Sequence, residues 1–238
     1  MQQPPATKEK IIQTKVIQAQ NLSYEFISHD NHIQVLRDLN LTIFNGEQVA
    51  IVGSSGSGKS TLLSLLAGLD IPSSGSVQIQ NKPFSDLDED GRAAVRASSM
   101  GFVFQSFQLL PSLTALENVM LPLQLKNNAN AKELSLEALN KVGLSERVQH
   151  YPKQLSGGEQ QRVAIARAFA TQPAILFADE PTGNLDKVTG LLIVDLLFKM
   201  NVEAGTTLVL VTHDVGLANR CQRQLKLENG VLTELVTA

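Results

Sequence analysis

Residues 53–61, which read GSSGSGKST, constrain this chain more than any other feature. They fill the pattern G-x-x-x-x-G-K-[ST] between an apolar strand-like stretch, residues 49–52, and an apolar helical run, residues 62–67. Glycines let successive backbone amides converge on phosphate oxygens, and the N-terminus of the following helix adds its positive dipole. A flexible Gly/Ser turn is the alternative, but such a turn does not need this strand–loop–helix context. The segment therefore predicts a nucleoside triphosphate site.

Two side chains in this loop have distinct expected roles. Lys59 is expected to reach the β- and γ-phosphates, and Ser60 to supply a hydroxyl to Mg²⁺ at the start of the helix. The predicted nucleotide-binding residues of the loop are Gly53, Ser54, Ser55, Gly56, Ser57, Gly58, Lys59, Ser60 and Thr61.

A second signal is the run ILFADE at residues 175–180, an apolar strand that ends in two carboxylates. Adjacent carboxylates at a sheet edge repel each other unless a cation lies between them or one has separate work. Asp179 is therefore predicted to hold Mg²⁺, directly or through water, and Glu180 to orient and polarise an attacking water. A helix N-cap is the alternative for these acids, although the Pro-Thr-Gly that follows argues against an immediate helix.

A third signal is the sequence Ser-Gly-Gly-Glu at residues 156–159, just before a helix predicted over residues 159–170. It places a small hydroxyl and two glycine amides at a helix N-terminus, which is a second possible anion site. Taken alone, it is also what an ordinary N-cap looks like.

Composition sets outer bounds on the protein. A chain of 238 residues, 43% of them hydrophobic, can form one large domain or one domain with a subdomain. A net charge of −3 with no basic stripe argues against a nucleic-acid partner. Cys221, the single cysteine, is interpreted as structural or incidental. No apolar stretch approaches the ~20 residues of a membrane-crossing helix, so we expect a soluble protein.

The order of predicted elements indicates an α/β fold. Residues 1–15 are expected to be a disordered tail and residues 16–238 the folded domain, with a helical subdomain at about 106–171. Asn45-Gly46 predicts a hairpin turn, and so does Asn229-Gly230. A helix around residues 191–200 between two apolar strands predicts a parallel sheet. Strands are predicted at residues 16–26, 33–36, 39–44, 47–52, 76–80, 100–105, 174–178 and 207–212.

The string LSGGEQQRVAIARA, together with the motifs above, closely resembles the signature of ATP-binding cassette (ABC) ATPases, and the resemblance extends from residue 16 to residue 235. It implies a P-loop NTPase fold with a parallel core sheet, an antiparallel β subdomain and a helical subdomain. It also implies hydrolysis of ATP with Mg²⁺.

The resemblance assigns roles to residues at matching positions. Tyr24 resembles the aromatic that stacks on adenine, although it could equally be a strand residue with one face in the core. Gln105 is similar to the glutamine that touches Mg²⁺ or water, and His213 to the histidine that bonds the γ-phosphate. The expected catalytic residues are thus Glu180, His213 and Gln105, and the Mg²⁺ ligands Ser60, Gln105 and Asp179. His29, His32 and His150 show no ligand spacing and are interpreted as surface residues.

In this family two subunits sandwich two ATP molecules. The resemblance implies that a second copy supplies groups in trans from the signature and from the loop that crosses to the partner, namely Ser156, Gly157, Gly158, Glu159 and Asp186. Loss of the γ-phosphate then removes the charge that both helix N-termini neutralise, so hydrolysis couples to dimer opening.

A membrane permease is the other implied partner. The stretch FVFQSFQLLPSL, which begins at Phe102 and ends at Leu113, resembles the groove that receives a helix of the membrane subunit. Burial inside the helical subdomain is the alternative. We expect Phe102 and Phe104 in the core and some of Phe107, Leu109 and Leu110 at the docking surface. The protein would then lie on the cytoplasmic face of the bacterial inner membrane.

Two longer segments bear on the subgroup. ADEPTGNLD at 178–186 and QSFQLLPSLTALENVMLPL at 105–123 resemble lipoprotein-releasing and macrolide-exporting ATPases and a related cell-division branch. Nutrient importers commonly carry Ser-Ala in place of Gly183-Asn184. A GTPase would need N-K-x-D, and residues 81–84, NKPF, lack its acid. A small-molecule kinase lacks an acceptor motif here, and soluble ABC proteins of repair or translation normally carry coiled-coil insertions or two cassettes.

Overall fold

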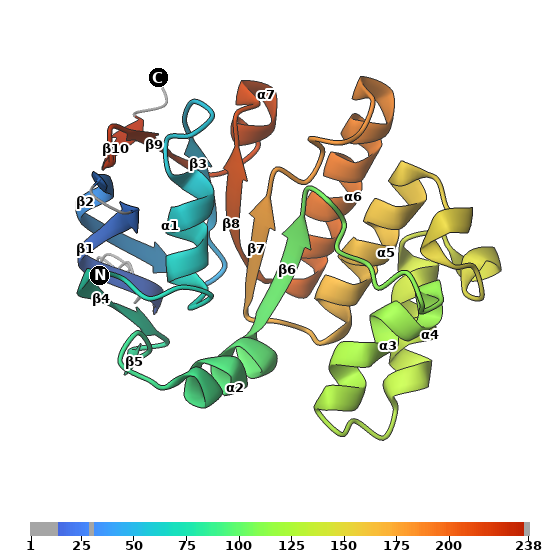
Figure 1. Ribbon diagram of the computed structural model, residues 1–238. Helices are drawn as coiled ribbons and strands as arrows, with labels where there is room; N and C mark the ends of the chain where they lie inside the picture. The colour runs from blue at the N-terminus through green and yellow to red at the C-terminus, as the bar shows by residue number, and fades with distance from the viewer. Residues whose placement is uncertain (1–13, 29–30, 236–238) are drawn as a thin grey trace, which may run out of the picture.

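The computed structural model describes residues 14–28 and 31–235 (Figure 1). The predicted tail falls outside the described residues except for its last two positions, and Lys15 already begins strand β1 (Lys15–Ser28). His29 also lies outside the described residues.

The main sheet carries the parallel core that the sequence predicts. Its described strands run in the order β10-β9-β3-β8-β7-β6. The neighbours from β9 to β6 pair in parallel, and among the described strands of this sheet only β10 pairs antiparallel. The bounds are β3 (Gln48–Val52), β6 (Met100–Phe104), β7 (Ile175–Asp179), β8 (Thr207–Thr212), β9 (Arg223–Glu228) and β10 (Val231–Leu235).

A second, antiparallel sheet has the order β2-β1-β4-β5 and contains β2 (Asn31–Phe44), β4 (Ser74–Ile79) and β5 (Lys82–Pro83). The predicted hairpin at Asn45-Gly46 is wrong, because β2 and β3 belong to different sheets. A turn does form there, with Gly46 at φ 75°. However, Val49, Ala50 and Ile51 are fully buried, and a strand apolar on both faces belongs in the middle of a parallel sheet. The second predicted hairpin, at Asn229-Gly230, is confirmed by the β9–β10 pairing.

Seven described α-helices surround the sheets: α1 (Lys59–Leu66), α2 (Glu89–Ser99), α3 (Ala115–Leu125), α4 (Ala131–Lys141), α5 (Gly157–Ala170), α6 (Lys187–Ala204) and α7 (Val215–Ala218). Helix α2 has no counterpart in the sequence prediction. Helix α6 begins earlier than predicted because Asp186 caps it, accepting hydrogen bonds from the amides of Val188 and Thr189. The range 106–171 holds α3, α4 and α5.

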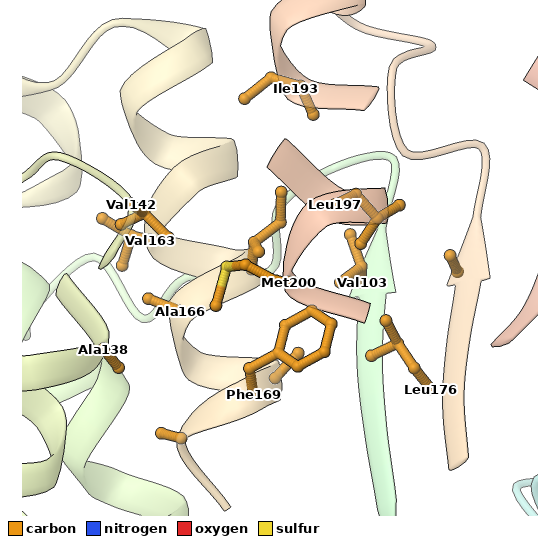
Figure 2. Packing of buried hydrophobic residues seen from close by; sticks show 14 of the residues in the cluster. Val103, Ala138, Val142, Val163, Ala166, Phe169, Leu176, Ile193, Leu197 and Met200 are labelled. Carbon is orange, nitrogen blue, oxygen red and sulfur yellow. The ribbon is translucent and has the colours of Figure 1, made fainter. Parts of the chain in front are cut away.

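The main sheet separates two hydrophobic clusters. Successive residues of β7 alternate between them, since Leu176 and Ala178 face the cluster under α3–α6 while Ile175 and Phe177 face the cluster beside α1. Figure 2 shows the first cluster, in which Phe169 and Met200 bring α5 and α6 together over the sheet. Both faces of the sheet are thus packed against hydrophobic side chains.

None of the helices in the described part of the chain is both long enough and apolar enough to cross a membrane.

Candidate active site

The C-terminal ends of four adjacent parallel strands meet at one edge of the main sheet (Figure 1). Val52 of β3 lies opposite Thr212 of β8, and Asp179 of β7 lies opposite both Val211 and Phe104. Each of these strands is followed by residues that the sequence singles out. The fold therefore brings together the phosphate-binding loop, Gln105, the two carboxylates and His213.

These residues border a cavity of about 630 Å³. Its lining comes from β2, from the loop before α1 and from the ends of three further strands: Val35, Ser55, Gly56, Gly58, Lys59, Ser60, Thr61, Gln105, Glu180 and His213. The N-terminal residues of α5 are not among them. The predicted site residues in this lining are thus all assigned to a single copy of the chain, and none is among those assigned to the second copy.

The phosphate-binding loop is folded tightly around its lysine. The buried Lys59 ammonium donates hydrogen bonds to the carbonyl oxygens of Gly53 and Ser54, each at 2.9 Å. Gly58, the residue before α1, has φ 95°, in the left-handed region that glycine adopts without strain. A Cβ on Gly53 would lie 2.5 Å from the Leu227 carbonyl oxygen, so glycine is needed there for the close approach of β9.

Asp179 and Ser60 are in direct contact. The Ser60 hydroxyl donates to the Asp179 carboxylate at 3.2 Å. The pKa of Asp179 is raised above its usual value. Burial is the largest cause and the nearby Glu180 charge adds to it, whereas the hydrogen bond from Ser60 and the charge of Lys59 act in the opposite direction. The charge of Glu180 thus acts against ionisation of Asp179, as expected for neighbouring carboxylates.

Glu180 is held in an unusual backbone conformation. Its φ is 46°, in the left-handed region, and its amide donates to the Val211 carbonyl at 2.9 Å. The Thr212 hydroxyl donates to one carboxylate oxygen at 3.3 Å, while His213 Nδ1 lies 2.8 Å from the other. The last residue of β8 and the residue after it thus hold a carboxylate that follows β7.

Gln105 is joined to the segment after Glu180. Gln105 Nε2 donates to Asn184 Oδ1 at 3.2 Å, and Asn184 Nδ2 donates to the backbone carbonyl of Gln105 at 3.0 Å. Asp186, which the sequence places in trans, caps α6 in its own chain.

The start of α5 forms a capping box. The Ser156 hydroxyl accepts from the Glu159 amide at 3.3 Å, and the Glu159 carboxylate accepts from the Ser156 amide and hydroxyl, each at 2.8 Å. The pKa of Glu159 is lowered, first by the bond from the Ser156 backbone amide and then by the bond from the Ser156 hydroxyl. Arg147 lowers it further, while burial acts in the opposite direction. Within this box the amides of residues 156 and 159 are used, and those of Gly157 and Gly158 are not.

Tyr24 lies apart from the cavity lining. It packs partly buried against the cluster beside α1, and its hydroxyl donates to Asp70 at 2.7 Å. The hydrogen bond to Asp70 raises the pKa of Tyr24. Tyr24 is thus a strand residue with one side against the core, and its stacking on adenine stays a prediction.

Several contacting residues were missed from the sequence. Thr212, Asn184 and Gly183 directly adjoin motif residues, so their place in the motifs was the available signal. Asp70 belongs to no motif, and its contact with Tyr24 needed the tertiary structure. Gln161 lies within the signature string, but the bond from its side-chain amide to the Pro181 carbonyl also needed the tertiary structure.

A second, more apolar cavity of about 370 Å³ is lined by residues of α2, β6, α3 and α5. Phe102, Phe104 and Gln108 line it, with Leu121, Pro122, Leu125 and Arg167. Phe107, Leu109 and Leu110 do not line it. Leu109 packs against the cluster under α3–α6, whereas Leu110 is exposed. Phe102 and Phe104 are only partly buried, so the expectation that both lie in the core is met in part. The docking role of Phe107, Leu109 or Leu110 stays a prediction.

Comparison with known proteins decides the family. The family model described as ABC transporter matches residues 36–183, more than half of the chain. This protein belongs to the ABC transporter family. It is an ATP-binding ATPase, and the parallel core sheet, antiparallel sheet and P-loop NTPase fold predicted from the sequence are confirmed.

Relatives in this ABC family cover almost the whole chain. YbbA of Escherichia coli K12, an uncharacterized ABC transporter ATP-binding protein, is 51% identical over 92% of the chain and 97% of its own length. The lipoprotein-releasing system ATP-binding protein LolD of Bordetella pertussis is 50% identical over 91% of the chain and 94% of its own length. A solved dimeric ATP-binding cassette in a post-hydrolysis state, bound to ADP and Pi, is 43% identical with a TM-score of 0.85, covering 93% and 100% of the two chains.

Proposed function

We propose that two copies of this chain form a composite ATPase, in which each ATP lies between the Lys59 loop of one copy and the Ser156 helix end of the other. One observation carries this proposal. The cavity beside Lys59 contains the in-chain groups, yet no residue of α5 is among those that line it. The dimeric state of the solved relative supports the same arrangement. Closure then requires ATP, and hydrolysis permits opening.

The phosphate-binding loop would hold the nucleotide in cis. Lys59 would exchange its bonds to two loop carbonyls for the β- and γ-phosphates, since an ammonium binds phosphate more strongly than a neutral carbonyl. The amides of residues 55–61 would surround the phosphates, and Tyr24 would cover one face of adenine with its partly exposed ring.

Hydrolysis would centre on Glu180. Its carboxylate would accept the proton of the attacking water while the oxygen of that water bonds to the γ-phosphorus and ADP leaves. A carboxylate can only accept hydrogen bonds, so His213 would direct Nδ1–H to Glu180. The γ-phosphate oxygens also only accept, so a bond to them from Nε2 would require the doubly protonated ring. Thr212 would fix the second carboxylate oxygen.

The donors at this edge fit Mg²⁺. Ser60 and Asp179 are already in contact, and Gln105 lines the same cavity. No group of three or more His, Cys, Asp or Glu side chains is placed to hold a metal ion in the described ranges. The proposed Mg²⁺ would rest on one carboxylate, two neutral side chains and the nucleotide phosphates. Mg²⁺ would supply neutralisation of the charge that develops on the transferred phosphoryl group. The Ser60 hydroxyl, the Asp179 carboxylate and the Gln105 amide oxygen would hold it.

In trans, the start of α5 would meet the γ-phosphate of the partner-bound ATP. The two amides that the capping box leaves, those of Gly157 and Gly158, would face the phosphate together with the Ser156 hydroxyl. Glu159 would keep Ser156 in place, and the segment that ends at Asp186 would cross to the partner.

The decisive experiment for the composite site is dilution. ATP turnover per chain should fall steeply as the protein is diluted from its dimeric to its monomeric range, measured alongside mass by light scattering. Strictly monomeric protein that hydrolyses ATP as fast as concentrated protein would overturn the proposal.

The membrane partner would dock in the cavity between α2, α3 and α5. Phe102 and Phe104 stack in parallel at its floor, with ring centroids 5.7 Å apart, and Leu125 at its rim is 75% exposed. An apolar floor of this size fits one turn or two of a helix. Leu125→Glu should reduce capture of the membrane subunit from detergent extracts, whereas Val202→Glu on exposed α6 should not. Equal capture by both variants would contradict docking there.

Among membrane complexes, the lipoprotein-releasing type is the one we propose. Identity of 50% to LolD and the segment ADEPTGNLD support it. ATP-driven closure would then perform mechanical work on the membrane subunits. The chain would lie peripherally on the cytoplasmic face of the bacterial inner membrane. Identification of the copurifying membrane protein tests this, and a nutrient-import permease would contradict it.

A further inference from the structure

Residues 183 and 184 contact Gln105 in two independent ways. The Gln105 amide nitrogen donates to Asn184 Oδ1, and the Asn184 amide donates to the Gln105 backbone carbonyl. The bare Cα of Gly183 lies against the same side chain. We infer that Gly183 and Asn184 are positioning residues, which fix where the Gln105 amide lies and which of its two ends points toward the nucleotide cavity. The inference rests on the proposed role of Gln105.

The direction of each hydrogen bond follows from one fixed point. A backbone carbonyl can only accept, so the NH₂ end of Asn184 must point at the Gln105 carbonyl. Asn184 Oδ1 is then the atom that Gln105 meets, and an oxygen acceptor requires the NH₂ end of Gln105. The remaining end of the Gln105 amide is Oε1. Because a hard cation or a water proton is bound by oxygen, this is the chemically useful end for the proposed role.

Gly183 is required for space, not for backbone freedom. Its φ does not fall in the left-handed region, so the backbone alone would accept another residue. A Cβ built at Gly183 would lie 2.6 Å from Gln105 Nε2 and 2.9 Å from Gln105 Cδ. The obstructed atoms belong to the far end of a flexible side chain. A methyl group at residue 183 should therefore leave the fold intact and displace Gln105.

The segment that carries Asn184 is itself anchored to the backbone of Glu180. The Gly183 amide donates to the Glu180 carbonyl at 3.0 Å, and the Leu185 amide to the Thr182 carbonyl at 3.0 Å. On its other side, Gln161 of α5 donates to the Pro181 carbonyl at 2.6 Å. Asn184 thus ties Gln105 to a turn whose position is set by Glu180 and by the signature helix. A shift of Glu180, of the signature helix or of the turn between them would therefore move Asn184, and with it the Gln105 amide.

The first test reads the side chain itself, without nucleotide. Two-dimensional ¹⁵N–¹H spectra of the full chain resolve side-chain amides, and Gln105→Ala identifies the Gln105 pair by its disappearance. Asn184→Ala and Gly183→Ala should each move that pair toward the position of a solvated glutamine. The control Gly190→Ala, whose Cβ would make only ordinary contacts of 3.5 Å and 3.7 Å with Thr182, should leave it in place. An unmoved Gln105 signal in Asn184→Ala would overturn the inference.

A conservative variant tests the assigned atoms. Asn184→Asp keeps an oxygen acceptor for the Gln105 NH₂ but cannot donate to the Gln105 carbonyl. The Gln105 side-chain signal should therefore stay near its parent position in Asn184→Asp, whereas it moves in Asn184→Ala. If aspartate and alanine behave alike, Oδ1 is not the atom that orients Gln105, and the assignment is wrong.

The second test measures the Mg²⁺ concentration that gives half-maximal binding of a fluorescent ATP analogue. Gln105→Ala sets the full effect, and Asn184→Ala should raise the requirement about threefold to tenfold, the size expected for one or two neutral hydrogen bonds. If Gln105→Ala raises the requirement while Asn184→Ala and Gly183→Ala do not, the positioning inference fails and the role of Gln105 stands. If Gln105→Ala has no effect, the proposed role of Gln105 fails, and the spectra alone decide the positioning.

Discussion

The N-termini of α1 and α5 both belong to the proposed ATP site, but they are built in opposite ways. Helix α1 begins after Gly58, which has no side chain to cap it, and places Lys59 at its first position. Helix α5 begins after Ser156, which forms a reciprocal capping box with Glu159. One end is left without a side-chain cap, and the other is satisfied largely by its own chain.

This difference fits the order in which the two ends would meet ATP. The end of α1 would receive the nucleotide within a single chain, so its amides must remain accessible to phosphate. The end of α5 waits for a partner, so its amides need satisfaction in the isolated chain. The capping box satisfies residues 156 and 159 and leaves the two glycine amides, 157 and 158. A helix end can therefore be stable alone and still present two donors to a second molecule.

The largest expected effect comes from holding both helix ends on an unbroken γ-phosphate. Glu180→Gln removes the proton acceptor, so turnover should fall at least about 100-fold, the usual contribution of a general base. ATP binding should persist, and the dimer should become long-lived. Rapid-quench turnover and gel filtration with ATP measure the two effects. Undiminished turnover would remove Glu180 from the catalytic role.

The next effect concerns the α1 end alone. Lys59→Ala removes a charged donor to phosphate, so ATP affinity should fall about 10- to 100-fold, as for the loss of one hydrogen bond to a charged group. Equilibrium binding of a fluorescent ATP analogue measures it in monomeric protein. Lys199→Ala, on the exposed face of α6, is the control and should bind normally. Unchanged affinity in Lys59→Ala would contradict the assignment of the loop.

The smallest effect concerns the α5 end, and the chain provides a matched control. Thr114 and Glu117 form the same capping box at α3 as Ser156 and Glu159 form at α5. Ser156→Ala and Thr114→Ala should each lower the free energy of unfolding by about 1 kcal/mol, the usual cost of losing a cap. Urea unfolding at pH 7 measures this. Only Ser156→Ala should also weaken ATP-dependent dimer formation; equal dimerisation of the two variants would contradict a trans role for α5.

The same pair of variants has a defined pH dependence. The pKa of Glu159 is lowered in the folded chain, so its contribution to stability is present above the unfolded pKa of about 4.3 and is lost as pH falls through the folded value. Ser156→Ala keeps the bond from the backbone amide of residue 156, the largest cause of that lowering, and removes the second cause, the bond from the Ser156 hydroxyl. The loss of stability between pH 5 and pH 3 should therefore be shallower in the variant than in the parent, and a steeper loss would contradict the capping interaction.

Most of the individual site residues could be predicted because each is part of a local pattern. The loop at residues 53–61 is recognisable from its glycines, Asp179 and Glu180 from the apolar run before them, and Ser156 from its spacing to Glu159. The roles given to these residues remain predictions, as does the helical subdomain at 106–171. The wrong hairpin at Asn45-Gly46 has the same origin, since a turn signal is local but the choice of pairing strand is not.

The sequence by itself determined the chemistry of each strand end, because a few neighbouring residues suffice to specify a turn, a cap or a carboxylate pair. Only the tertiary structure decided which ends meet. The order β3-β8-β7-β6 places residues more than a hundred positions apart on one edge, and it sets Asn184 against Gln105 across 79 residues. Strand order depends on how both sheet faces are buried, which is a property of the whole core.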